Sequence, residues 1–209
     1  MAKKYLIYGH SQAKRLDLYT KTSRKYNFEI PISEAEVECV GISGLHAKDV
    51  LKGGKHYRTF DAKLRSFKPQ ILILCIGDND ISEETLSDEI SSLVEVIITK
   101  IKKKYTFLEK ILVSSILPRY ENSHVNHLSY NEQAFQVNQK LCAWAIKQKY
   151  SFFIWNPLPF PNQNMKKYQN FRRSNFLRDG VHLSPAGYFK MFRAIRRLIK
   201  KFIPKKVKC

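Results

Sequence analysis

The chain has 209 residues, the size of one domain, and its apolar content of 44% is enough for a buried core and argues against wholesale disorder. Its net charge is +19, and 14 Lys and Arg residues but a single acid, Asp179, lie between Asn162 and Cys209. We expect this basic C-terminal region to attract a polyanion, which can be nucleic acid, an anionic membrane face or an acidic protein, and charge alone does not choose among them. No apolar run approaches the roughly 18 residues of a membrane helix, so no transmembrane segment is expected.

The N-terminal residues and the cysteines predict an intracellular protein, either cytoplasmic or nuclear. The apolar stretch YLIY at residues 5–8 is too short for the core of a signal peptide. The four cysteines lie far apart and form no CxxC pair, which is typical of reduced thiols and not of a disulfide framework.

Short apolar runs alternate with amphipathic runs along the chain. The apolar runs predict strands at residues 4–8, 36–42, 70–76, 110–116 and 151–155. The run at 70–76 is nearly all apolar, which favours a central strand covered on both faces. Apolar residues at three- and four-residue spacing predict helices at 82–104, 130–150 and 184–202, with Ser82 and Ser184 as N-caps. A further helix is predicted to follow Ser11.

This order of elements predicts a three-layer α/β/α sandwich with a five-stranded parallel sheet over residues 1–203, and a basic tail at 204–209. In such a fold the loops after the strands line the ligand crevice. The loops 118–129 and 156–178 are therefore candidate walls of a site. The candidate pocket residues near these loops are Arg119, Tyr120, Trp155, Phe160 and Asn164.

Four turns carry chemically active residues. The sequence GHS at 9–11 places Ser11 at a strand-to-helix turn, beside the free N–H groups of a helix start. The sequences GISG at 41–44 and GDND at 77–80 supply Gly44 and Asn79. Asp179 and His182 stand three residues apart, so the carboxylate can orient the imidazole. These are the parts of an acyl-transfer site: a nucleophile, a base, an orienting acid and donors for an oxyanion.

This arrangement resembles the SGNH (GDSL-type) hydrolase family, and the resemblance runs from the first predicted strand to the last helix. It implies a flavodoxin-like sandwich and a serine esterase that acts on a small acyl ester without a metal or cofactor. Ser11 would be the nucleophile, His182 the general base and Asp179 the residue that holds His182. The Ser11 and Gly44 backbone N–H groups and the Asn79 side chain would form the oxyanion hole.

The first motif departs from the family pattern, because His10 stands where the family usually has Asp. That Asp is not the triad acid, so the chemistry can persist while the turn or the local pKa values change. In the second motif Gly44 is the better match and Gly41 the alternative. The chain is also similar to the esterase-like domains of some retrotransposon proteins, where a basic surface would fit nucleic-acid handling.

Simpler interpretations of the same residues remain open. Ser11 can act as a helix cap, and Gly44 and Asn79 can be ordinary turn residues. Asp179 can be an ordinary carboxylate of a surface turn, and His182 a half-buried histidine beside the last helix. A metal site is not expected, because no recognisable ligand spacing joins the four residues that could be imagined as ligands: His10, Asp78, Asp80 and His182.

The last predicted helix has one apolar and one basic face. The apolar face is expected to pack on the sheet, which leaves the basic face to solvent. The alternative is a ridge that contacts phosphates together with the basic tail. The protein would then be a binding module for nucleic acid with an SGNH-like fold and little or no hydrolysis.

Overall fold

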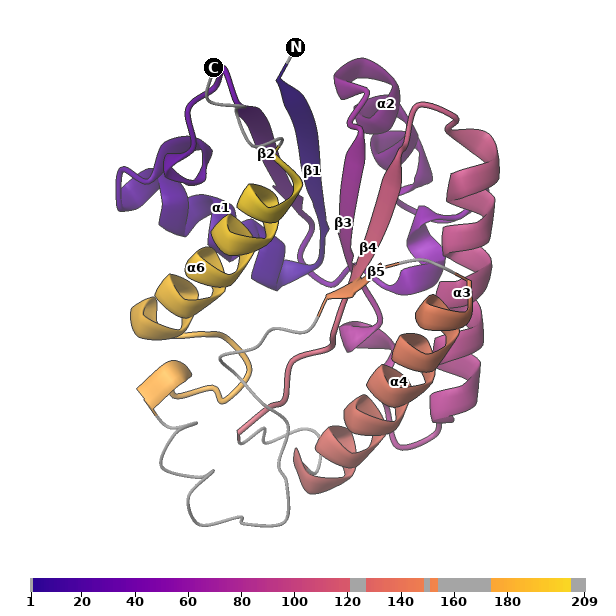
Figure 1. Cartoon of the computed structure of the whole chain (residues 1–209). Helices are drawn as coiled ribbons and strands as arrows, with labels where there is room; N and C mark the ends of the chain where they lie inside the picture. The colour runs from indigo at the N-terminus through magenta and orange to yellow at the C-terminus, as the bar shows by residue number, and fades with distance from the viewer. Residues whose placement is uncertain (1, 121–126, 149–150, 154–173, 204–209) are drawn as a thin grey trace.

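The computed structural model describes residues 2–120, 127–148, 151–153 and 174–203 of the chain. Five parallel strands form one sheet in the order β2-β1-β3-β4-β5 (Figure 1). The sheet confirms the predicted fold class. The strands are β1 Lys3–Gly9, β2 Ala35–Gly41, β3 Ile71–Cys75, β4 Lys110–Ser114 and β5 Ser151–Phe153.

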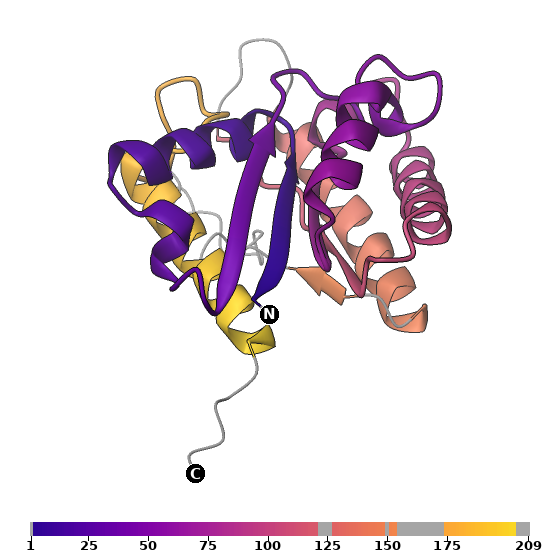
Figure 2. The ribbon, with the colours of Figure 1, turned by 90° about the horizontal axis from the view of Figure 1, so that it is seen from above.

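Helices cover both faces of the sheet, as Figure 2 shows from above. One face is covered by α1 Ser11–Thr22 and α6 Pro185–Phe202. The other face is covered by α2 Tyr57–Phe67, α3 Ser87–Lys104 and α4 His127–Lys147. The short 3-10 helices of the described chain are η1 Tyr26–Glu29, η2 Ala47–Val50 and η3 Asp78–Asp80. None of the described helices is long and apolar enough to cross a membrane.

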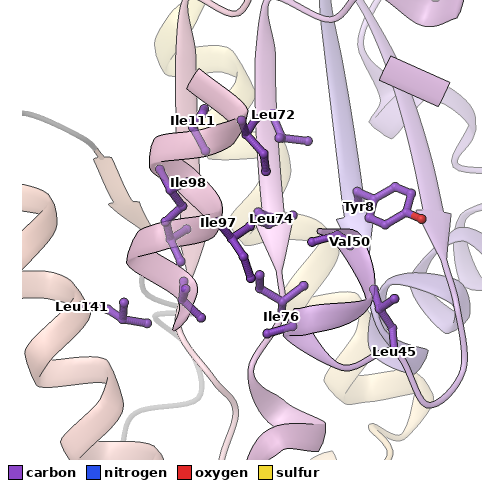
Figure 3. Packing of buried hydrophobic residues seen from close by; sticks show 14 of the residues in the cluster. Tyr8, Leu45, Val50, Leu72, Leu74, Ile76, Ile97, Ile98, Ile111 and Leu141 are labelled. Carbon is purple, nitrogen blue, oxygen red and sulfur yellow. The ribbon is translucent and has the colours of Figure 1, made fainter. Parts of the chain in front are cut away.

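The central strand β3 contributes to two separate cores. Its residues alternate between the faces, because successive side chains of a strand point in opposite directions. Leu72 and Leu74 belong to the core under α2, α3 and α4, where Figure 3 shows them beside Ile97 and Ile98. Ile73 belongs to the core under α1 and α6. Burial on both faces explains why this strand is apolar throughout.

The predicted helix at 82–104 begins later than expected, and Ser82 does not cap it. Helix α3 starts at Ser87, and its N-cap is Leu86, whose side chain is 65% exposed. The residues before it are held by other contacts: Ser82 Oγ lies 2.7 Å from Thr85 Oγ1, and the Ser82 carbonyl accepts a hydrogen bond from Gln133 Nε2 at 3.1 Å. These contacts give the connection between η3 and α3 a non-helical structure.

The start of α6 is confirmed, whereas α2 was not predicted. Ser184 Oγ accepts a hydrogen bond from the Gly187 backbone N–H at 3.2 Å, and a proline follows it in the first turn. Helix α2 buries three apolar residues, Phe60, Leu64 and Phe67, among charged neighbours. Other expectations fall on residues outside the described ranges, namely the tail 204–209, most of the two candidate loops, and Trp155, Phe160 and Asn164.

The end of β2 packs tightly against the first turns of α1. In the sheet register, Gly9 at the end of β1 lies opposite Gly41 of β2 and Cys75 of β3. A Cβ atom on Gly41 would overlap the backbone nitrogen of Lys14. Glycine at position 41 therefore allows the helix that follows Ser11 to lie against the sheet edge.

We expect the substitution Gly41→Ala to destabilise the fold by about 2–4 kcal/mol, because the added methyl group meets backbone that cannot rotate away. Urea unfolding followed by circular dichroism measures this change. The exposed Ser43→Ala variant is the matched control, with an expected change within about 0.5 kcal/mol. A Gly41→Ala protein as stable as this control would show that α1 can shift without cost.

Candidate active site

Ser11 is the first residue of α1 and sits at the carboxyl end of β1. The cap position belongs to His10, whose carbonyl accepts a hydrogen bond from Ala13 N–H at 3.0 Å, so the interpretation of Ser11 as a cap is wrong. Within the described chain no hydrogen bond engages the Ser11 hydroxyl or its backbone N–H. This N–H lies at the positive end of the helix dipole, where it can bind an anion.

The turns after β2 and β3 hold each other in place. Gly44 has a φ of +71°, a left-handed conformation that glycine adopts without steric cost. The Asn79 side-chain N–H donates to the Leu45 carbonyl at 3.0 Å. The Asp80 carboxylate accepts from the Ala47 backbone N–H at 2.9 Å. Two side chains of η3 thus fix the loop that carries Gly44.

Asp179 and His182 form a hydrogen-bonded pair before α6. His182 Nδ1 lies 2.8 Å from Asp179 Oδ2. The other carboxylate oxygen accepts the backbone N–H groups of Val181 at 2.9 Å and His182 at 2.8 Å. Partial burial raises the pKa of Asp179, but the hydrogen bonds from His182 and Val181 outweigh it and bring the pKa below its usual value. The ionised carboxylate orients the His182 ring through Nδ1, so the Nε2 atom of the ring can act on a reacting group.

A buried glutamine next to Ser11 connects the helix to this pair. Gln12 Nε2 donates to the Val181 carbonyl at 2.8 Å, and Gln12 Oε1 accepts from the Tyr188 hydroxyl of α6 at 2.6 Å. One side chain therefore links the segments that carry Ser11 and His182. Neither Gln12 nor Tyr188 was predicted from the sequence. The one local signal for them is a polar residue directly after the serine.

The structure brings four of the five predicted site residues to one cavity of about 810 Å³. These four are Ser11, Gly44, Asn79 and His182; Asp179 reaches the site through His182. Gly41, the alternative glycine, is not among the described lining residues. The described hydrogen bonds include none between the Ser11 hydroxyl and the His182 ring. In many enzymes this contact is long or absent without a ligand and forms only when substrate binds.

Behind the cavity lies a buried ionic cluster. His10 Nδ1 is 3.7 Å from Asp78 Oδ2, and both side chains are buried. Arg119 Nη2 lies 3.4 Å from the same oxygen, and the Tyr130 hydroxyl donates to the other one. The Arg119 guanidinium stacks on the Tyr130 ring at 4.0 Å. Arg119 was expected to border the pocket, but it is buried against Asp78 and is not among the described lining residues of the cavity.

Burial and the charged neighbours act on the pKa values in this cluster. Burial lowers the pKa of His10, against the attraction of Asp78, and nearby Arg119 acts in the same direction. Burial raises the pKa of Asp78, but His10, Arg119 and the Tyr130 hydrogen bond outweigh it and lower that pKa. Asp78 is therefore ionised beside His10, and an aspartate at position 10 would place a second carboxylate next to it. In the described chain no three His, Cys, Asp or Glu side chains are placed to hold a metal ion.

Several solved structures of the same fold are named as hydrolases. The structure is similar to the M. smegmatis aryl esterase, with 15% identity, a TM-score of 0.69, and 97% of this chain and 100% of that chain covered. It is similar to a GDSL-like lipase from Bacteroides thetaiotaomicron, with 18% identity and a TM-score of 0.65. The match covers 95% of this chain and 88% of that chain. It is also similar to the lipase/acylhydrolase from Enterococcus faecalis, with 17% identity and a TM-score of 0.64. The match covers 99% of this chain and 100% of that chain.

Sequence comparison adds the family. None of the curated proteins matches the chain. The structural likenesses, at these low identities, show the fold alone. The model of the GDSL-like Lipase/Acylhydrolase family, however, matches residues 10–195, a range that includes all four turns of the candidate site except the glycine before His10. The chain therefore belongs to the GDSL-like lipase/acylhydrolase family, which supports a hydrolase of ester bonds.

Proposed function

We propose that the protein is a serine esterase that cleaves carboxylic esters with Ser11 as nucleophile, His182 as general base and Asp179 as the acid that orients it. One observation carries the proposal: Ser11, Gly44, Asn79 and His182 line a single cavity, and His182 Nδ1 is held 2.8 Å from the Asp179 carboxylate.

The reaction follows from these positions. The Ser11 hydroxyl attacks the ester carbonyl while His182 Nε2 takes its proton. The tetrahedral intermediate collapses, the C–O bond to the alcohol breaks, and His182 returns the proton to the leaving alcohol. A water molecule, deprotonated by His182, then attacks the acyl group on Ser11. The acid leaves and the serine regains its proton.

Three donors are suited to the negative oxygen of the intermediate. The backbone N–H groups of Ser11 and Gly44 have no partner within the described chain. Asn79 uses one side-chain N–H for the Leu45 carbonyl and has a second one available. The hydrogen bond between Asn79 and the Leu45 carbonyl holds the Asn79 side chain beside the loop that carries Gly44. These oxyanion donors are therefore in place before negative charge develops on the substrate oxygen. Such preorganisation is the main source of electrostatic catalysis.

The basic face of α6 gives no specific support to nucleic-acid binding. Most of the predicted apolar face of this helix, Phe192 and Ile195 among them, is buried against the sheet, whereas Phe189 is exposed. On the basic face, Arg196 lies 3.4 Å from the Glu29 carboxylate, and Arg193 lies over the Phe189 ring. A polyanion partner for the basic C-terminal region therefore stays a prediction.

We expect a fluorophosphonate probe to label Ser11 and the Ser11→Ala variant to lose both labelling and hydrolysis of short-chain aryl esters. The His182→Ala variant is expected to lower kcat about 10³-fold or more, because the attacking hydroxyl then lacks its base. The Asn79→Ala variant is expected to lower kcat about 10²-fold, the typical effect of losing one oxyanion donor. Mass spectrometry of the labelled peptide and steady-state kinetics measure these effects.

The Ser23→Ala variant, at the exposed end of α1, is the matched control and is expected to behave like the wild type. Folded wild-type protein that takes up no probe, or that is labelled equally well in the Ser11→Ala variant, would exclude Ser11 as the nucleophile.

The His10→Asp substitution restores the usual family residue but places a second buried carboxylate against Asp78. We expect it to lower the free energy of unfolding by about 2 kcal/mol or more and to reduce kcat/KM, because two buried like charges repel. Adding Asp78→Asn removes the repulsion and is expected to recover most of both losses. Urea unfolding and ester hydrolysis measure both variants. If His10→Asp alone were as stable and active as the wild type, the His10–Asp78 contact would have no such role.

A further inference from the structure

Two cations lie one helical turn from the proposed nucleophile. Lys14 and Arg15 follow Ser11 by three and four residues in α1, so all three share one face of the helix. At this spacing the Cβ atoms are about 5–6 Å apart. Both cations line the same cavity as Ser11. A group within a few bonds of the scissile ester would therefore come within reach of them.

These two cations are not neutralised inside the cavity. The acid among the described lining residues is Asp17, and its carboxylate pairs with Lys21 Nζ at 2.6 Å. Lys14 Nζ has a described contact of 3.5 Å with Ser43 Oγ, which carries no charge. Arg15 has no ion pair within the described chain. The cavity thus presents two positive charges without a carboxylate partner.

The N-terminus of α1 adds to the positive potential of the two cations. Lys14 and Arg15 stand in the second turn of the helix, and the first turn, whose free N–H groups form the positive end of the helix dipole, contains no acid. An anion bound near Ser11 would therefore be attracted by both side chains and by the helix N-terminus.

The described wall of the cavity has few apolar residues, although more than half of its exposed surface is apolar. Leu18 and Val181 are the apolar residues, and the remaining lining residues are polar, charged or glycine. Apolar surface can hold the body of a substrate, whereas the two unpaired cations beside Ser11 select for its charge.

We propose that the substrate of this esterase carries an anionic group, such as a carboxylate, phosphate or sulfate, close to the scissile bond, and that Lys14 and Arg15 bind it. The proposal rests on the esterase function proposed above and adds the substrate class. It makes Lys14 and Arg15 determinants of specificity rather than catalytic residues.

Two matched substrate pairs test the proposal and locate the anion. In the first pair, 4-acetoxybenzoate and its methyl ester, the charge lies on the leaving phenol. In the second pair, phenyl hemiglutarate and its methyl ester, the charge lies on the acyl group. The readout is the ratio of kcat/KM for the anionic over the neutral partner, divided by the corresponding ratio of hydroxide hydrolysis rates. We expect the wild type to favour the anion about five- to tenfold in at least one pair at low salt, and this preference to shrink at about 0.5 M salt.

Substitutions at the two cations separate this effect from a general loss of activity. The Lys14→Gln/Arg15→Gln variant is expected to bring the favoured ratio close to one, and the Arg15→Glu variant to bring it below one. The Arg24→Gln variant removes an exposed cation outside the described lining and is expected to keep the wild-type ratio.

The outcomes distinguish the two proposals. A wild-type ratio near one in both pairs, or a favoured ratio that the double variant leaves unchanged, overturns the anionic substrate while probe labelling of Ser11 still supports the esterase. Failure of the probe to label Ser11 overturns the esterase itself.

Discussion

Parallel strand pairing is the constraint on which the candidate site depends. Because β1, β2 and β3 run in the same direction and in register, Gly9, Gly41 and Cys75 end at one edge of the sheet. Ser11, Gly44 and Asn79 each follow these ends within four residues. The central strand is buried on both faces, so the edge cannot shift without disrupting the core. The sheet thereby brings three separate turns to one cavity, which Ser11, Gly44 and Asn79 line.

The sheet does not place His182, whose loop leads into α6. Polar contacts do this: Gln12 binds the Val181 carbonyl at 2.8 Å, and the Tyr120 backbone N–H binds the Gly180 carbonyl at 2.8 Å. Such contacts are directional and can adjust by small amounts, unlike the packed strands. This difference is compatible with the proposed mechanism, in which the oxyanion donors are fixed and the imidazole approaches the serine.

The sequence predicts the strands and the reacting residues because both leave local signals. Apolar runs mark the strands within about two residues, and the residues with catalytic chemistry stand in the turns directly after them. Contacts between distant residues leave no such signal. The start of α3 depends on Gln133, and the partner of His10 is Asp78, so neither can be derived from a local pattern. The unusual residue of the first motif, His10, is explained by its contact with the Asp78 carboxylate, which the structure shows and the sequence does not.

The charged groups near Ser11 fall into two sets. In the buried set, His10, the N-cap of α1, contacts Asp78, and Arg119 and Tyr130 contact the same carboxylate. In the cavity, Lys14 and Arg15 lack a carboxylate partner in the described chain. A histidine that contacts a buried carboxylate thus precedes Ser11 in the sequence, and two cations without a carboxylate partner follow it. A net charge of +19 is consistent with attraction of anionic substrates from solution.

A crystal structure of the protein inhibited by an aryl phosphonate tests the central claim most directly. The account predicts phosphorus bonded to Ser11 Oγ, with the phosphoryl oxygen within about 3.2 Å of the Gly44 N–H and the Asn79 side-chain N–H. It also predicts the His182 Nε2 atom within about 3.2 Å of an oxygen on the adduct. An adduct on another residue, or a phosphoryl oxygen that meets none of these donors while His182 faces away, would contradict it.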